Sequence, residues 1–111
     1  MKRKLVAYVS ASGKIVRDRI PEIISDSGKK PIYSTVSRDE AVEALEEKLS
    51  EELEEYLADH SLEEMADILE VMHGILFLKG IDWETLEEVR QKKRAERGGF
   101  EGCILLEDIK E

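Results

Sequence analysis

The sequence predicts a mainly α-helical fold: an antiparallel bundle of three principal helices with a small peripheral β element, completed by oligomerisation. Three observations support this class. Apolar residues recur at helical spacing between residues 38 and 97, capping-box patterns mark two helix starts, and glycines mark two helix ends. At 111 residues the chain is expected to form one domain, residues 1–111, with a mostly aliphatic core.

Capping boxes predict where the first two principal helices begin. Ser37 and Glu40 are spaced so that the serine oxygen can accept a hydrogen bond from the amide three residues later. We therefore expect a helix over residues 38–58. Ser61 and Glu64 repeat the same pattern and open the second helix.

Glycines predict where the helices end. The second helix is expected to run to Lys79, with Gly80 as its C-terminal cap. Asp82 can cap a third helix, which we expect to run to about Arg97 and to stop at the glycine pair starting at Gly98.

The segments outside these helices carry weaker signals. Residues 1–13 are expected to be an N-terminal extension, with a short strand over residues 5–9. A short helix is expected within residues 15–25, where Pro21 suits its first turn. Residues 32–36 and 103–106 are predicted strands that could pair beside the helices.

Composition excludes several classes of function. The formal net charge of −9 argues against binding a nucleic-acid polymer, because phosphate backbones are held by positive surfaces. No apolar stretch is long enough for a membrane span, so no membrane partner is expected. Cys103 is the single cysteine, which rules out an intrachain disulfide and makes a cytoplasmic location the expectation.

The first expected helix contains the acidic segment EELEE at residues 51–55. Glu52 and Glu55 lie three positions apart, so they share one face at the edge of the apolar stripe. Glu51 and Glu54 point further round, toward solvent. The segment therefore divides into an inward pair and an outward pair.

The second expected helix carries a row of acids into an apolar body. Glu64 and Asp67, in the segment EMAD, are followed one turn later by Glu70. An ionised carboxylate among apolar residues is costly without a partner, and a cation can serve several carboxylates at once. Hard divalent cations such as Mg²⁺ take oxygen ligands. The expected ligands come from both helices: Glu52, Glu55, Glu64 and Asp67, with Glu70 in reserve.

Basic residues are candidates for binding an anionic substrate. Lys93 and Arg97 share one face of the third helix, and Arg97 precedes paired glycines that would let backbone approach a ligand. Arg17 and Arg19 are second candidates, and Lys48 stands in the row of the inward glutamates. The alternative explanation is that these positive charges favour the helix dipole and form ion pairs with acids on the protein surface.

The order of these motifs resembles a known group. EExxE at residues 51–55 followed by ExxD at 64–67 resembles the signature of the all-α nucleoside triphosphate pyrophosphohydrolases, the MazG-like superfamily. VRDRIPEII at 16–24, ADILEVM at 66–72 and RGGFEG at 97–102 are similar to its phosphoribosyl-ATP pyrophosphohydrolase-like subfamily.

The resemblance runs from about residue 14 to the C-terminus and implies both a site and a reaction. By motif position, Glu52, Glu55, Glu64 and Asp67 would be catalytic and would hold Mg²⁺, with Mn²⁺ as a substitute. The reaction it implies cleaves a nucleoside triphosphate between the α- and β-phosphates, giving monophosphate and pyrophosphate in nucleotide-pool house-cleaning. It also implies a homodimer or homotetramer.

Three alternatives stay open. Phosphoribosyl-ATP hydrolysis in histidine biosynthesis is one, although segments 16–24 and 97–102 are not those expected of the biosynthetic enzyme. A di-iron carboxylate bundle is another, because Glu70 and His73 form an ExxH pair, of which such sites need two. The third is a non-catalytic oligomerisation module, which would have no need of Asp67 and Glu70 within an apolar helix.

Overall fold

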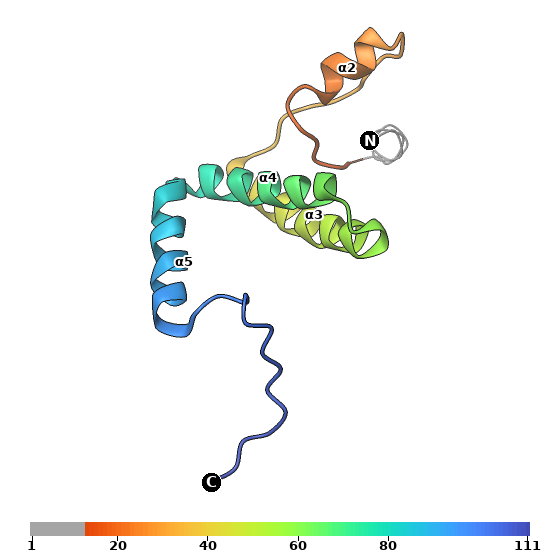
Figure 1. Cartoon of the computed structure of the whole chain (residues 1–111). Helices are drawn as coiled ribbons and strands as arrows, with labels where there is room; N and C mark the ends of the chain where they lie inside the picture. The colour runs from red at the N-terminus through yellow and green to blue at the C-terminus, as the bar shows by residue number, and fades with distance from the viewer. Residues whose placement is uncertain (1–12) are drawn as a thin grey trace. The chain divides into compact units, whose positions relative to one another are not determined.

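The computed structural model describes residues 13–111, in which four helices and no strand are present. Figure 1 shows these helices in chain order. They are α2 (Ile20–Asp26), α3 (Arg38–Asp59), α4 (Leu62–Lys79) and α5 (Trp83–Arg97). The helical class is confirmed for this part of the chain, whereas the three-helix bundle and its completion by oligomerisation stay predictions.

The chain divides into two compact units, Met1–Gly80 and Ile81–Glu111. The first unit, described from residue 13 onward, contains α2, α3 and α4. The second contains α5 and the C-terminal segment. The expected single domain over residues 1–111 stays a prediction.

Helices α3 and α4 begin directly after the two serines that were predicted to cap them. The side-chain oxygen of Ser37 accepts a hydrogen bond from the amide of Glu40 at 3.2 Å. The side-chain oxygen of Ser61 accepts one from the amide of Glu64, also at 3.2 Å. Gly80 caps α4 with a φ of 72°, in the left-handed region that glycine adopts without steric cost.

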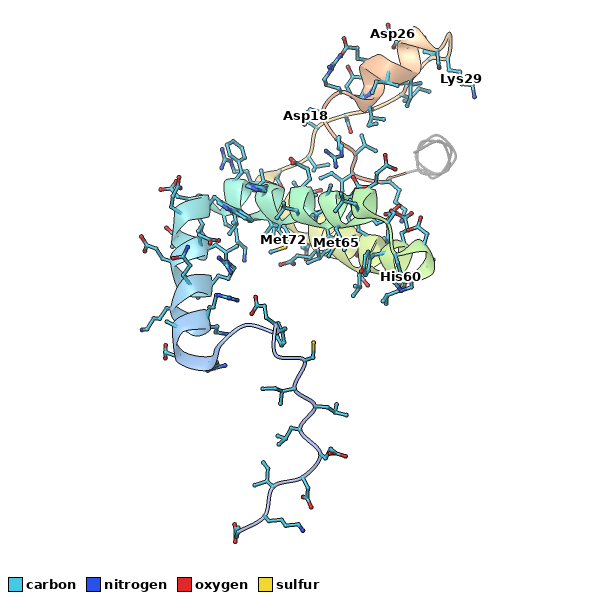
Figure 2. The ribbon with its side chains drawn as sticks, in the orientation of Figure 1. Asp18, Asp26, Lys29, His60, Met65 and Met72 are labelled. Atoms are coloured by element: carbon cyan, nitrogen blue, oxygen red, sulfur yellow. The ribbon has the colours of Figure 1, made fainter. Side chains whose placement is uncertain are left out.

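A short turn folds α3 and α4 into an antiparallel hairpin. Figure 2 shows His60 at this turn and Met65 and Met72 along α4. Arg38, at the start of α3, donates a hydrogen bond to the carbonyl of Leu78, near the end of α4, at 3.4 Å. The hairpin therefore aligns the end of α3 with the beginning of α4.

The hairpin has a thin core. Among the described residues, the buried hydrophobic side chains are Ala41 and Val71. Gly74 lets the helices approach, because a Cβ added there would stand 3.2 Å from the side chain of Leu45. Large apolar side chains stay exposed on both helices: Leu53, Leu57, Leu62, Met65, Leu69 and Phe77.

The predicted β element is not confirmed. Residues 32–36 and 103–106 have no regular secondary structure, and Ile32 and Ile104 are 95% and 90% exposed. A strand is stable only when its backbone pairs with another strand. The apolar composition of two short segments is therefore not enough to form a β-sheet. The expected strand at residues 5–9 lies outside the described residues.

The remaining helices match their predicted positions. Helix α2 begins with Pro21 in its first turn, as expected of a proline that cannot donate a backbone hydrogen bond. Helix α5 begins after Asp82, whose side chain makes no capping hydrogen bond. Within residues 13–111, no helix is both long and apolar enough to cross a bilayer.

Candidate metal centre

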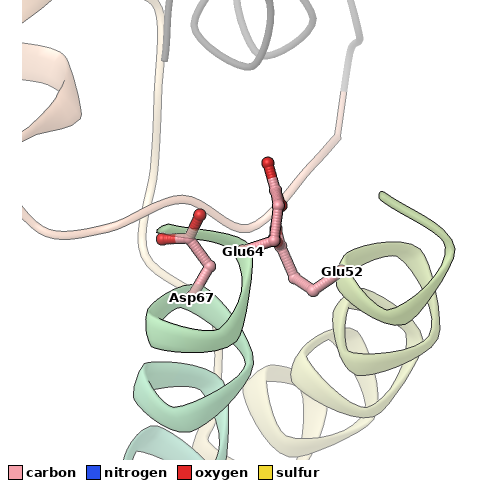
Figure 3. A group of neighbouring side chains, drawn as sticks. All are labelled: Glu52, Glu64 and Asp67. Carbon is pink, nitrogen blue, oxygen red and sulfur yellow. The ribbon is translucent and has the colours of Figure 1, made fainter. Parts of the chain in front are cut away.

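Three carboxylates from α3 and α4 converge in the first unit. Glu52 comes from α3, and Glu64 and Asp67 come from α4. One oxygen of each lies within 4.8 Å of the others. Figure 3 shows the three side chains projecting to the same side of the helix pair. Glu52 and Glu64 are buried, and Asp67 is half-buried.

The hairpin explains this convergence. Glu64 and Asp67 are one helical turn apart, so they share a face of α4. The hydrogen bond from the amide of Glu64 to Ser61 fixes the first turn of α4, where Glu64 lies. Because the helices are antiparallel, this turn stands beside the last part of α3, where Glu52 lies. Local capping and helix pairing together build the cluster.

Neighbouring acids on α3 differ in burial. Glu52 is 2% exposed. The side chain of Glu51 is 41% exposed and forms an ion pair with Lys14. Glu54 is exposed. The inward position of Glu52 and the outward positions of Glu51 and Glu54 agree with their helical spacing.

The other two candidate ligands lie outside the cluster. Glu55 is half-buried, and one of its carboxylate oxygens is shielded from solvent. Glu70 is exposed on α4. The structure thus brings together Glu52, Glu64 and Asp67, but not all the acids that the sequence nominated.

Two of the candidate cations lie at these carboxylates. The Lys48 ammonium is 3.6 Å from an oxygen of Glu52, and both side chains are buried. The Arg17 guanidinium donates a hydrogen bond of 2.6 Å to Asp67. Each of these cations therefore contacts one carboxylate of the cluster.

The other candidate cations lie elsewhere. Arg19 pairs at 2.9 Å with Glu22 of α2. Lys93 and Arg97 are exposed on α5, in the second unit.

Two further ion pairs lie in the second unit, and each lowers the pKa of its acid. Arg90 forms a salt bridge with Glu87, and its hydrogen bonds, with one from Gln91, lower the pKa of Glu87 to about 2. Arg94 lies 3.1 Å from Glu101 and lowers the pKa of that carboxyl. Both arginines therefore have acidic partners on the protein itself.

One contact at the hairpin had no signal in the sequence. Lys14 pairs with Glu51, and the hydrogen bond and charge of that carboxylate raise the pKa of the lysine. Residues 13–15 line a small hollow with Lys48 and Glu51 of α3. Helical spacing places residues on a helix face, but it cannot find the partner of a lysine in an irregular segment.

The donor set of the cluster fits a hard cation. Closely spaced carboxylates repel one another when ionised, and a divalent ion converts this repulsion into shared attraction. All three donors in the cluster are carboxylate oxygens, the ligand type that Mg²⁺, Mn²⁺ and Ca²⁺ prefer. Glu52, Glu64 and Asp67 could therefore hold a divalent metal ion.

Comparison with known proteins gives one partial similarity. A protein of Mycolicibacterium smegmatis, described as an uncharacterized protein, is 51% identical to this chain over 45 residues, which are 40% of this chain. The matched part is 46% of that protein, so the similarity spans about half of its length. The chain matches no protein-family model and no solved structure.

Proposed function

We propose that this protein is a Mg²⁺-dependent nucleoside triphosphate pyrophosphohydrolase that releases nucleoside monophosphate and pyrophosphate. The observation that carries the proposal is the convergence of Glu52, Glu64 and Asp67 within 4.8 Å on a helical hairpin. The resemblance of the EExxE and ExxD segments to the MazG-like superfamily adds the reaction class. Together they favour metal-dependent attack on a phosphoanhydride.

The three clustered carboxylates would hold the ion. A bound Mg²⁺, for which Mn²⁺ could substitute, would neutralise phosphate charge and make a water molecule more acidic. Burial of Glu52 and Glu64 keeps their oxygens in place and shields them from bulk water.

Glu55 is the candidate general base. It lies one turn beyond Glu52 on α3, outside the three clustered carboxylates, with one oxygen buried. Its carboxylate would accept a proton from the attacking water as the new phosphorus–oxygen bond forms and pyrophosphate leaves. A carboxylate that is not a metal ligand can accept this proton without releasing the ion.

The two cations at the cluster would have different roles. Lys48 is buried against Glu52 and would hold that carboxylate in position. The side chain of Arg17 is 52% exposed, so its guanidinium could also donate to phosphate oxygens. Arg19, Lys93 and Arg97 remain further candidates for substrate binding.

We also propose a cytoplasmic homodimer or homotetramer. Exposed leucines on α3 and an exposed Phe77 on α4 support assembly, because apolar residues left uncovered on a hairpin commonly mark an interface.

A panel of nucleotides tests the proposed reaction. Canonical and modified nucleoside triphosphates, and phosphoribosyl-ATP, would be incubated with the protein and Mg²⁺ and scored for pyrophosphate release. We expect release from at least one of them, and loss of about 10–100-fold or more in Glu64→Gln. Glu63→Gln is the matched control, because Glu63 is the adjacent, exposed acid. Absence of pyrophosphate from the whole panel would contradict the proposal.

A further inference from the structure

The N-terminal arm, residues 13–19, is attached to both helices of the hairpin. Lys14 pairs with Glu51 of α3, and Arg17 donates a 2.6 Å hydrogen bond to Asp67 of α4. The second contact joins residues 50 positions apart in the sequence. The arm therefore reaches the carboxylate cluster from outside the two helices that build it.

Arg17 and a metal ion would require the same carboxylate. Asp67 accepts a short, charge-assisted hydrogen bond from Arg17 and also belongs to the cluster with Glu52 and Glu64. A guanidinium and a divalent cation repel each other when both approach one carboxylate. Arg17 and the metal ion therefore compete for the carboxylate of Asp67.

Arg17 is better able to leave the cluster than Lys48. Lys48 and Glu52 are both buried and lie one turn apart on α3, so their separation would disturb the helix pair. Arg17 belongs to a segment without regular structure, and its side chain is half exposed. Solvent can replace its lost hydrogen bond, which makes its release the less costly change.

We propose that Arg17 competes with the divalent cation for Asp67, as an inhibitor that belongs to the protein itself. This inference rests on the proposed function. In the metal-free protein the guanidinium occupies Asp67. Binding of a divalent cation releases it, and the freed guanidinium then donates to a phosphate of the substrate. Metal affinity is therefore lower than the carboxylates alone would give, because each binding event must break the Arg17–Asp67 pair.

Calorimetric titration with Mg²⁺ and with Mn²⁺, without nucleotide, tests the competition. We expect Arg17→Gln to bind both ions about threefold to tenfold more tightly than the wild type. Arg19→Gln is the matched control, because Arg19 lies in the same arm and pairs locally with Glu22. Its metal affinity should be unchanged, and circular dichroism would check that both variants keep their helix content.

Removal of a nearby positive charge could tighten binding without any movement, so a second measurement follows Arg17 itself. In the wild type, the NMR order parameter of the Arg17 Nε–Hε group should fall when Mg²⁺ is added, while that of Arg19 stays constant. An unchanged order parameter for Arg17 would overturn the proposed release, even if Arg17→Gln bound the ion more tightly.

The experiment separates this inference from the proposed function. If neither the wild type nor Arg17→Gln binds a divalent ion, the metal site fails and the competition fails with it. If both bind with equal affinity, the competition is wrong while the metal site stands.

Discussion

Lys48 offers a stringent test of how the carboxylate cluster is stabilised. Its ammonium lies 3.6 Å from Glu52, and both side chains are buried. With an effective dielectric constant of about 20, two unit charges at that distance attract by about 5 kcal/mol. Lys48→Met removes this attraction and leaves Glu52 buried beside other acids. We expect the free energy of unfolding to fall by about 3–5 kcal/mol, as for other buried pairs that lose one partner.

Urea denaturation without metal would measure this loss. Lys79→Met is the control, because Lys79 is an exposed lysine at the end of α4 and should change stability by less than about 1 kcal/mol. The double variant Lys48→Met/Glu52→Gln should be more stable than Lys48→Met by about 2 kcal/mol or more, because it no longer buries the Glu52 carboxylate without its lysine. Added Mg²⁺ should also restore part of the lost stability.

Two results would contradict this role of Lys48. Lys48→Met could prove as stable as the wild type, or the double variant could show no recovery. Either would mean that the lysine does not compensate the charge of Glu52.

Three further predictions concern helix ends and surface charge. Ser61→Ala should lower the free energy of unfolding by about 1 kcal/mol in urea denaturation, since it removes the side-chain oxygen that accepts the hydrogen bond of the Glu64 amide at the start of α4. Gly80→Ala should cost a similar amount, about 1 kcal/mol in the same assay, because φ there is 72°. Arg90→Gln should raise the pKa of Glu87 from about 2 toward 4.5 in an NMR titration. A lowered acid pKa stabilises the fold at a pH above the unfolded value, so the contribution of this pair is complete above pH 4.5 and is lost as the pH falls toward 2.

Helix ends were the most predictable part of the fold. The capping serines, Ser37 and Ser61, and the cap glycine, Gly80, act on backbone groups within a few residues of themselves. Such signals can be read from a short stretch of sequence. In the structure, Ser37 and Ser61 directly precede α3 and α4, and Gly80 directly follows α4. The predicted strands, by contrast, depended on pairing between residues 32–36 and 103–106, which no local pattern specifies.

The same distinction holds at the candidate site. Helical spacing distinguished Glu52 from Glu51, and the structure buries Glu52. The exclusion of Glu55 and Glu70 from the three-carboxylate cluster depends on how α3 and α4 pack, which periodicity does not give. The contact between Arg17 and Asp67 depends on the path of an irregular segment. The sequence could nominate Arg17, but it could not name its partner.

Direct measurement of metal binding tests whether Glu52, Glu64 and Asp67 bind a divalent cation. Titration of the purified protein with Mn²⁺, followed by electron paramagnetic resonance, would count the ions bound and measure their affinity. We expect one ion per chain in the wild type, an affinity at least about tenfold weaker in Glu52→Gln, and no change in Glu54→Gln, which alters an exposed acid of the same helix. Equal affinity in Glu52→Gln and the wild type would contradict it.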